Sequence, residues 1–210
     1  VLKPLLKPGC ILTDVGSVKG NICKKAAELG LSRQFIGGHP MAGSEKTGFE
    51  NSTDILLENA YYLLTPFEET PLENLSLLKE LVAKTGANCV VLSPSEHDKI
   101  TAAISHVPHL VSAALAKLVK DADTGDYKDY MHLLAAGGFK DTTRIAASSP
   151  EMWEQICAAN PTAISQLLGE YINSLTAVKE HIDSGDSHYI YKLFEEAGIY
   201  RNTFFGPDRS

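Results

Sequence analysis

Residues 9–30 read GCILTDVGSVKGNICKKAAELG, and this stretch decides the expected fold. Its apolar residues 11–13 predict a short strand, residues 14–17 a turn, and the remainder a helix that ends at Gly30. The alternation continues, with further strands expected within residues 33–40, 59–66 and 87–93 and an amphipathic helix within residues 71–86. Strands that alternate with helices indicate an α/β domain with a parallel or mixed sheet.

Beyond residue 92 the sequence pattern becomes helical. Ser93 and Glu96 form a capping-box pattern with Pro94 at the first helical position, and the helix continues for about 25 residues. Pro108 lacks a backbone N–H, and we expect it to bend this helix. Further helices are expected within residues 127–138, 150–159, 160–185 and 188–198. The sequence therefore predicts an α/β part, residues 1–92, followed by an all-α part, residues 93–210.

The helix expected within residues 160–185 carries an apolar stripe along most of its length. Such a stripe is longer than one subunit usually covers. The stripe predicts that the chain forms a homodimer through its helical part.

Composition and charge exclude several classes of partner. The chain has 210 residues, 44% of them hydrophobic, and a net charge of -7 with its basic residues scattered. This distribution predicts no binding to nucleic acid or to an anionic membrane. Its four cysteines lie far apart without C-x-x-C spacing, which indicates reduced thiols and no disulfide framework. No uninterrupted apolar run approaches the roughly 18 residues of a transmembrane helix. We expect a cytoplasmic protein.

Residues 36–50, IGGHPMAGSEKTGFE, have neither helical nor strand periodicity and predict a loop from Gly37 to Gly48. Glycine tolerates positive φ and lacks a Cβ, so such a loop allows the backbone to approach a ligand closely. His39 is the candidate catalytic group, because an imidazole with a pKa near 6.5 exchanges protons at cellular pH. Taken alone, His39 fits a structural role in a surface turn equally well.

Two further stretches carry candidate binding residues. In SHVPH, residues 105–109, Ser105 and His109 are four apart and share a helix face, whereas His106 is expected to point elsewhere. In GGFKDTTRIA, residues 137–146, Lys140 and Arg144 follow a glycine pair. Arginine holds a carboxylate through two parallel hydrogen bonds, so Arg144 is a candidate anion clamp. An ordinary helix face and a surface arginine are the alternatives.

The turn DVGSVKG, residues 14–20, brings Ser17 to the start of a helix, where free N–H groups can hold an anion. It is not a phosphate-binding P-loop, because the required glycine and lysine spacing is missing. A metal site built from His39, His106 and His109 is conceivable. The sequence has no H-E-x-x-H motif and no cysteine near these histidines, so we expect no metal site.

Four stretches, in this order and spacing, resemble the prephenate dehydrogenase family. They are TDVGSVKG (13–20), GGHPMAGSEKTG (37–48), SPSEHDKITAAISHVPHL (93–110) and GGFKDTTRIAASSPEMW (137–153). The resemblance extends over almost the whole chain. It implies that residues 1–92 are part of a Rossmann-like NAD(P)-binding domain. It also implies that residues 93–210 form a helical substrate-binding and dimerisation domain.

The resemblance implies an oxidoreductase that converts prephenate to 4-hydroxyphenylpyruvate in tyrosine biosynthesis. Hydride leaves for the nicotinamide, a histidine takes the hydroxyl proton, and loss of carbon dioxide makes the ring aromatic. The resemblance favours NAD and leaves NADP open. Arogenate dehydrogenases share these motifs, so arogenate is an alternative substrate, and tyrosine is a candidate inhibitor. A non-catalytic dimeric module that binds prephenate or tyrosine is a further alternative.

The resemblance also assigns residues to roles. His39 is the implied catalytic base, and Ser17 orients it together with the substrate hydroxyl. The residues implied to bind or border the substrate are Ser44, Glu45, Ser105, His109, Lys140, Arg144 and Trp153. Among them, Glu45 gates access, Arg144 grips a prephenate carboxylate, and Trp153 comes from the partner subunit. The turn residues Asp14, Gly16 and Ser17 are the implied cofactor contacts.

One feature departs from the family pattern. The family begins with a strand and a G-x-G-x-x-G turn that seats the pyrophosphate of the dinucleotide. This sequence contains no such motif. We therefore expect a truncated form that lacks the N-terminal portion of the nucleotide-binding domain. A natural remnant that binds without oxidising is the alternative.

Overall fold

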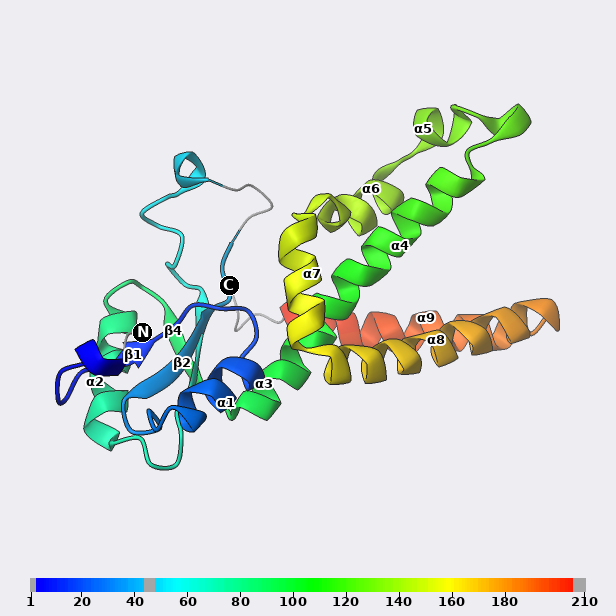
Figure 1. Cartoon of the computed structure of the whole chain (residues 1–210). Coiled ribbons are helices and arrows are strands. Elements are labelled where there is room, and N and C mark those ends of the chain that lie inside the picture. The colour runs from blue at the N-terminus through cyan, green and yellow to red at the C-terminus, as the bar shows by residue number, and fades with distance from the viewer. Residues whose placement is uncertain (1–2, 44–47, 206–210) are drawn as a thin grey trace. The chain divides into compact units, whose positions relative to one another are not determined.

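The computed structural model describes residues 3–43 and 48–205 (Figure 1). The chain divides into two compact units. The first unit comprises Val1–Ile164 and the second Ser165–Ser210. The domain boundary predicted after residue 92 falls inside the first unit and stays a prediction.

Four strands form a mixed sheet in the order β1-β2-β3-β4. They are β1 (Leu12–Thr13), β2 (Phe35–Pro40), β3 (Tyr61–Thr65) and β4 (Asn88–Val91). β1 pairs with β2 in parallel, β2 with β3 antiparallel, and β3 with β4 in parallel. Each strand lies within the range that the sequence predicts. The sheet is the mixed one of the two alternatives.

Helices α1 (Gly20–Glu28) and α2 (Leu72–Ala83) cover the sheet through two separate apolar clusters. The first cluster joins Cys23 and Ala26 of α1 to Phe35 of β2. The second joins α2 to the neighbouring strand residue Ile36. Successive residues of a strand point to opposite faces, so α1 and α2 lie on opposite sides of β2. His39, four residues after Phe35, therefore points to the α1 face.

The paired glycines before His39 belong to β2, so the prediction of a loop from Gly37 is wrong. A Cβ on Gly37 would lie 2.2 Å from Oγ1 of Thr65, and one on Gly38 would lie 2.4 Å from the carbonyl oxygen of Asp14. These glycines allow segments of the chain itself, rather than a ligand, to approach the strand. The strand expected within residues 33–40 overlaps that loop, and the strand prediction is the one that holds at residues 37–40.

A long helix begins at the predicted capping box, in which Oγ of Ser93 accepts from the N–H of Glu96. It comprises α3 (Pro94–Thr101), the π-helical segment η3 (Ala102–His106) and α4 (Val107–Ala122). In η3, the N–H of Val107 donates to the carbonyl of Ala102, five residues earlier. The π-helical turn directly precedes Pro108, which cannot donate the next backbone hydrogen bond. The proline therefore changes the helical register.

By length and composition alone, the helix 94–122 could cross a membrane. The prediction that no stretch would do so considered uninterrupted apolar runs, whereas polar residues interrupt this helix. Its α3 part contacts α1 and β3, and its α4 part contacts α6 (Gly137–Thr143) in the same compact unit. Its buried residues include His97, Asp98 and His106. We therefore describe it as a helix that packs against other elements of the first unit.

Shorter helices complete the chain. They are α5 (Tyr130–Leu134), α7 (Pro150–Ala159), α8 (Pro161–Asp183) and α9 (Ser187–Asn202), with the 3-10 helices η1 (Lys3–Leu5), η2 (Phe49–Asn51), η4 (Gly125–Tyr127), η5 (Arg144–Ala147) and η6 (Thr203–Phe205). α8 begins in the first unit and continues into the second.

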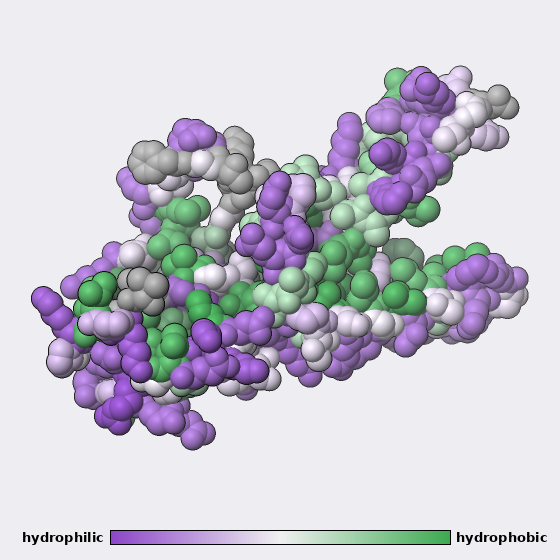
Figure 2. Space-filling model, in the orientation of Figure 1, coloured by the Kyte–Doolittle hydropathy of each residue, from purple (hydrophilic) through white to green (hydrophobic). Residues whose placement is uncertain are grey.

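In the second unit, a turn joins α8 to α9. Gly185 adopts a φ of 73° there, and Asp186 caps α9 by accepting from the N–H of Tyr189 at 3.1 Å. Large apolar side chains on both helices are exposed in the single chain, and hydrophobic residues are visible along this hairpin in Figure 2. They include Ile172, Leu175, Ile182, Tyr191, Phe194 and Ile199.

Candidate active site

A cavity of about 410 Å³ lies within the first unit, next to the end of β2. The long helix, η5 and α7 supply its other walls. Six of the residues implied by the sequence line it together, namely Ser17, His39, Ser105, His109, Arg144 and Trp153. They come from segments far apart in the chain, the first at residue 17 and the last at residue 153. We therefore consider this cavity the candidate active site.

His39 is held at the end of β2 with only 9% of its surface exposed. Its Nδ1 lies 2.8 Å from Nε2 of His97. Burial, and then the nearby His97, Lys19 and His106, lower the pKa of His39 from 6.5 to about 4. The expectation of a pKa near 6.5 is therefore corrected. The imidazole is neutral at cellular pH, the form that accepts a proton.

His97 connects His39 to a buried carboxylate. His97 is fully buried, and its Nδ1 lies 2.8 Å from Oδ1 of Asp98. Asp98 also accepts the backbone N–H groups of Lys19 and Gly20, each at 2.8 Å. Burial opposes ionisation, but the hydrogen bonds from His97, Lys19 and Gly20 lower the pKa of Asp98 overall. The N–H groups predicted to be free at the start of α1 are thus occupied by a side chain.

Sequence reasoning missed both His97 and Asp98. The available signal was a His-Asp pair in the first turn after a capping box, at the end of a predicted strand. That signal identifies two polar side chains, but it does not indicate that they face His39. Their partners lie 58 and 79 residues away in the chain.

An ion pair between the buried Lys19 and the partly exposed Asp14 fixes the residue before His39. Lys19 is fully buried, and its Nζ contacts the carboxylate of Asp14 and the carbonyl of Gly38. Asp14 in turn accepts the N–H of Gly38 at 3.0 Å. The two charged side chains therefore hold both backbone polar groups of Gly38. This arrangement fixes the position of the Cα of His39 relative to the turn after β1.

The predicted cofactor contacts Asp14 and Gly16 lie in this turn, outside the lining of the cavity. The N–H of Gly16 donates to Asp14 at 2.9 Å, and Gly16 is exposed. Ser17, the next residue, lines the cavity together with His39. The cofactor roles of all three residues stay predictions.

The helical wall contributes His109, whose Nδ1 donates to the carbonyl of Ser105 at 2.8 Å. Trp153 stacks on the His109 ring, with 4.1 Å between the ring centroids. Trp153 of the single chain thus lines the cavity of that same chain, and the implied contribution from the partner subunit stays a prediction. α7 brings it within reach of α4 without a second copy. Its Nε1 is buried and has no hydrogen-bond partner among the described residues.

His106 also lines the cavity, so the expectation that it points elsewhere is wrong. It is the last residue of η3, and the π-helical register turns it toward the cavity that His109 also faces. Burial lowers its pKa to about 4. Its Nδ1 lies 3.4 Å from Nδ2 of Asn160, and the same amide donates to the carbonyl of Asp98 at 2.8 Å.

Some implied residues are not brought to this cavity. Lys140 lines a different one, together with Lys120, Asp123 and His132. Lys140 and Arg144 are four residues apart, but α6 ends at Thr143 and the chain continues as η5, so they do not share a helix face. Ser44 and Glu45 lie outside the described residues.

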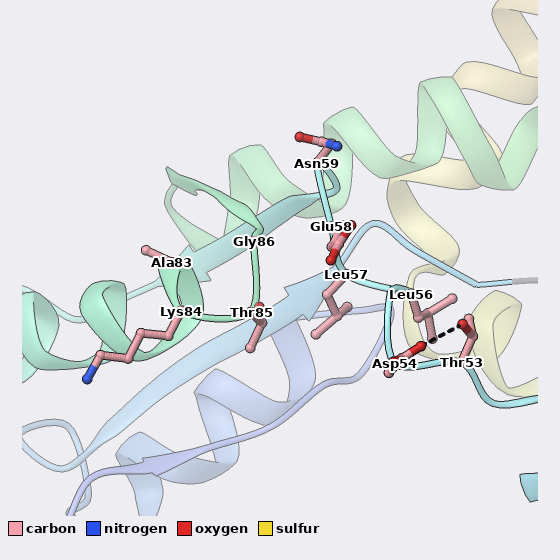
Figure 3. Close-up of a pocket in the computed structure, with 10 residues that line it drawn as sticks. All are labelled: Thr53, Asp54, Leu56, Leu57, Glu58, Asn59, Ala83, Lys84, Thr85 and Gly86. Atoms are coloured by element: carbon pink, nitrogen blue, oxygen red, sulfur yellow. Dashed lines mark hydrogen bonds between the residues drawn. The ribbon is translucent and has the colours of Figure 1, made fainter.

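A larger cavity, of about 730 Å³, lies elsewhere in the first unit (Figure 3). The segment 53–59 and the end of α2 line it, and the side chain of Lys84 extends away from that segment. None of the implied residues that the structure describes lies there, and the lining includes no histidine. The smaller cavity is therefore the better candidate despite its size. Within residues 3–43 and 48–205, no cluster of three or more His, Cys, Asp or Glu side chains could hold a metal ion.

Comparisons with known proteins agree with this geometry. Residues 1–91 match the family described as "Prephenate dehydrogenase, nucleotide-binding domain", and residues 93–196 match "Prephenate dehydrogenase, dimerization domain". The fold matches a crystal structure of prephenate dehydrogenase from A. aeolicus with a TM-score of 0.89. Sequence identity to that protein is 33%, and the match covers 97% of this chain and 70% of that chain. The chain belongs to the prephenate dehydrogenase family.

Other members of the prephenate dehydrogenase family give the same result. Prephenate dehydrogenase from Bacillus subtilis is 39% identical over 193 residues, which is 91% of this chain and 52% of that protein. The crystal structure of Synechocystis arogenate dehydrogenase is 33% identical, with a TM-score of 0.86 and coverage of 97% of this chain and 72% of that chain. The chain spans about half the length of the first two curated relatives it matches. The expected Rossmann-like part with a mixed sheet, followed by a mostly helical part, is confirmed.

Proposed function

We propose that this protein oxidises and decarboxylates prephenate to 4-hydroxyphenylpyruvate with a nicotinamide cofactor. The observation that supports the proposal most strongly is that His39 and Arg144 line one cavity. The substrate carries a hydroxyl group whose proton needs an acceptor and carboxylates that need a cation. The cavity offers a buried neutral imidazole and a guanidinium for these two needs.

In the proposed reaction, the substrate hydroxyl donates its hydrogen bond to Nε2 of His39. The carbon that bears the hydroxyl loses its hydrogen as hydride, the hydroxyl proton passes to His39, and a ring carbonyl forms. The bond to the ring carboxylate then breaks, and carbon dioxide leaves. The electron pair of that bond makes the ring aromatic, and the carbonyl oxygen takes up a proton to become the phenol. Arg144 pairs with a substrate carboxylate, and Ser17 orients the hydroxyl.

The bound cofactor supplies the hydride acceptor. In this chain, the turn residues Gly16 and Ser17 fit a role beside the nicotinamide, because Gly16 is exposed and Ser17 lines the cavity next to His39. We propose NAD as the cofactor. The A. aeolicus relative was crystallised with NAD+ and hydroxyphenyl propionate, which supports this choice. The 210 residues contain no G-x-G-x-x-G turn, so we assign no pyrophosphate contact within them.

Arogenate is the second candidate substrate. The chain is as similar to the Synechocystis arogenate dehydrogenase as to the A. aeolicus prephenate dehydrogenase, with 33% identity in both cases. Arogenate carries an amine where prephenate has a ketone, and both share the hydroxyl and the ring carboxylate. The proposed roles of His39 and Arg144 are therefore the same for either substrate.

The test is nicotinamide reduction, followed at 340 nm, by protein expressed from the complete reading frame. Prephenate and arogenate are each offered with NAD and with NADP, and a 2-hydroxy acid is the control substrate. The proposal predicts reduction of NAD with prephenate and none with the hydroxy acid. A protein that binds prephenate without reducing either cofactor would contradict the enzymatic role and favour a binding module. Added tyrosine tests its proposed role as an inhibitor.

We further propose a cytoplasmic homodimer that forms through the helical part. The exposed apolar residues of α8 and α9 support this assembly, because a single chain leaves them in contact with water. Sedimentation velocity is expected to give the mass of two chains. Charge substitutions at Leu175 and Phe194, both exposed in the single chain, are expected to shift the protein to the mass of one.

A further inference from the structure

Three side chains form a hydrogen-bonded chain that ends at the cavity. Asp98 contacts Nδ1 of His97, and Nε2 of His97 contacts Nδ1 of His39, both at 2.8 Å. Only the last of the three lines the cavity. The mechanism described above uses His39 and gives no role to the other two residues.

The donor in each of these two hydrogen bonds follows from whether each group can donate or accept a proton. Asp98 receives two backbone N–H groups besides His97, and hydrogen bonds keep it ionised, so it acts only as an acceptor. Nδ1 of His97 must therefore carry a proton. In neutral His97, Nε2 is then an acceptor, and it receives the proton of Nδ1 of His39. The contact with His97 uses Nδ1 of His39, so its Nε2 is left with a lone pair.

We propose that His97 and Asp98 are positioning residues that hold His39 with its proton on Nδ1 and a lone pair on Nε2. This inference rests on the proposed function for its catalytic meaning, because only that tautomer can take a hydroxyl proton at Nε2. The opposite tautomer would present an N–H to the substrate hydroxyl and could accept nothing there. His97 and Asp98 thus fix both the orientation of the His39 ring and the ring nitrogen that carries its proton.

The surroundings of His39 fit this role. The other charged or titratable groups that act on it are Lys19, His106 and Asp14. Lys19 is paired with Asp14 and with the carbonyl of Gly38. His106 contacts Asn160. Each of these neighbours has a hydrogen-bond partner of its own, and among the described residues it is His97 whose ring nitrogen lies within hydrogen-bond distance of Nδ1 of His39.

The first test reads the tautomer without any substrate. Long-range 1H–15N correlation spectra distinguish the protonated from the unprotonated ring nitrogen of a neutral histidine, and the variant H39N assigns the signals. The proposal predicts a protonated Nδ1 and an unprotonated Nε2 for His39 in the unsubstituted protein at neutral pH. A protonated Nε2 on His39 would overturn it. This measurement needs no variant of His97 and no activity.

Two variants then separate the contacts of His97. The amide of Asn reaches the position of the imidazole Nδ1, so H97N keeps the contact with Asp98 and removes the contact with His39. The longer Gln reaches the position of Nε2, so H97Q offers an amide oxygen to Nδ1 of His39. We expect H97N to give a mixture of His39 tautomers and H97Q to restore the single tautomer. An unchanged tautomer in H97N would contradict the proposal.

Kinetics test the consequence for turnover. With prephenate and NAD, H97N is expected to lower kcat by about 100-fold with a KM within about twofold, and H97Q to recover to within about tenfold. Thermal unfolding of both variants controls for stability. A role limited to structure predicts similar losses in both variants, and that result would overturn the proposal. If even the unsubstituted protein reduces no NAD, the proposed function fails, while the spectra still decide the tautomer.

Discussion

Acidification is expected to destabilise the protein well before its carboxylates are protonated. His39 and His106 are 9% and 2% exposed, and burial lowers the pKa of each from 6.5 to about 4. At a pH between about 4 and 6.5, both imidazoles are protonated in the unfolded chain and neutral in the folded protein. The unfolded state therefore binds more protons, and stability falls as pH falls through this window. The full stabilisation is present above pH 6.5.

The magnitude follows from the same two pKa values. For one histidine whose pKa falls from 6.5 to about 4, linkage gives a loss of about 2 kcal/mol between about pH 7 and about pH 5. The same estimate applies to His106. A loss of this size is a large fraction of the stability of an ordinary domain.

The assay is urea unfolding at about pH 7 and about pH 5, with the free energy of unfolding extrapolated to water. The variant H106N is expected to lose about 2 kcal/mol less on acidification than the unsubstituted protein, because it lacks one of the two buried titrating groups. The difference between the two pH values is compared, which cancels any loss of packing. The same substitution at the exposed His188 is the matched control. A stability that is flat or rises on acidification, or an unaltered loss in H106N, would refute the reasoning.

Three further predictions concern the elements that hold the site. G38A is expected to lower the free energy of unfolding by about 1–3 kcal/mol and kcat by at least tenfold, because its Cβ would lie 2.4 Å from the carbonyl oxygen of Asp14 and displace the strand beside His39. G138A, whose Cβ meets no described atom within 4 Å, is the control, and equal effects of the two variants on urea unfolding and turnover would contradict this. K19M is expected to destabilise by about 1–3 kcal/mol, since it leaves the carbonyl of Gly38 and the partly exposed carboxylate of Asp14 without their buried cation. K117M, which removes an exposed pair, is expected to change unfolding little, and an equally small change in K19M would argue against the role of Lys19. R144A is expected to raise the KM for prephenate by about tenfold with a smaller change in kcat, and an unaltered KM in steady-state assays would remove the clamp assignment.

Much of the fold could be predicted because its boundaries are local. The helix that ends before Gly30 and the capping box at Ser93 and Glu96 each depend on residues within one turn. The glycines of β2 could not be assigned in this way. Their requirement comes from Thr65 and Asp14, which approach them only in the folded sheet.

The residues of the candidate site also differ in whether a local sequence pattern could predict them. Six implied residues line one cavity, because the motifs that carry the family resemblance include the residues of that cavity. His97 and Asp98 lie in one of those motifs but act through contacts 58 and 79 residues away, which no local pattern encodes. Lys140 was grouped with Arg144 because both follow the same glycine pair, but α6 ends between them and Lys140 lines a different cavity.

The central claim is that His39 takes the hydroxyl proton of a substrate anchored in the cavity that it shares with Arg144. The most direct measurement is the pair of values, kcat and the dissociation constant for prephenate, for H39N in protein from the complete reading frame. The account predicts that kcat falls by about 100-fold or more while the dissociation constant stays within about threefold. A variant that keeps kcat within about tenfold of the unsubstituted protein, or that loses binding in proportion to turnover, would contradict it.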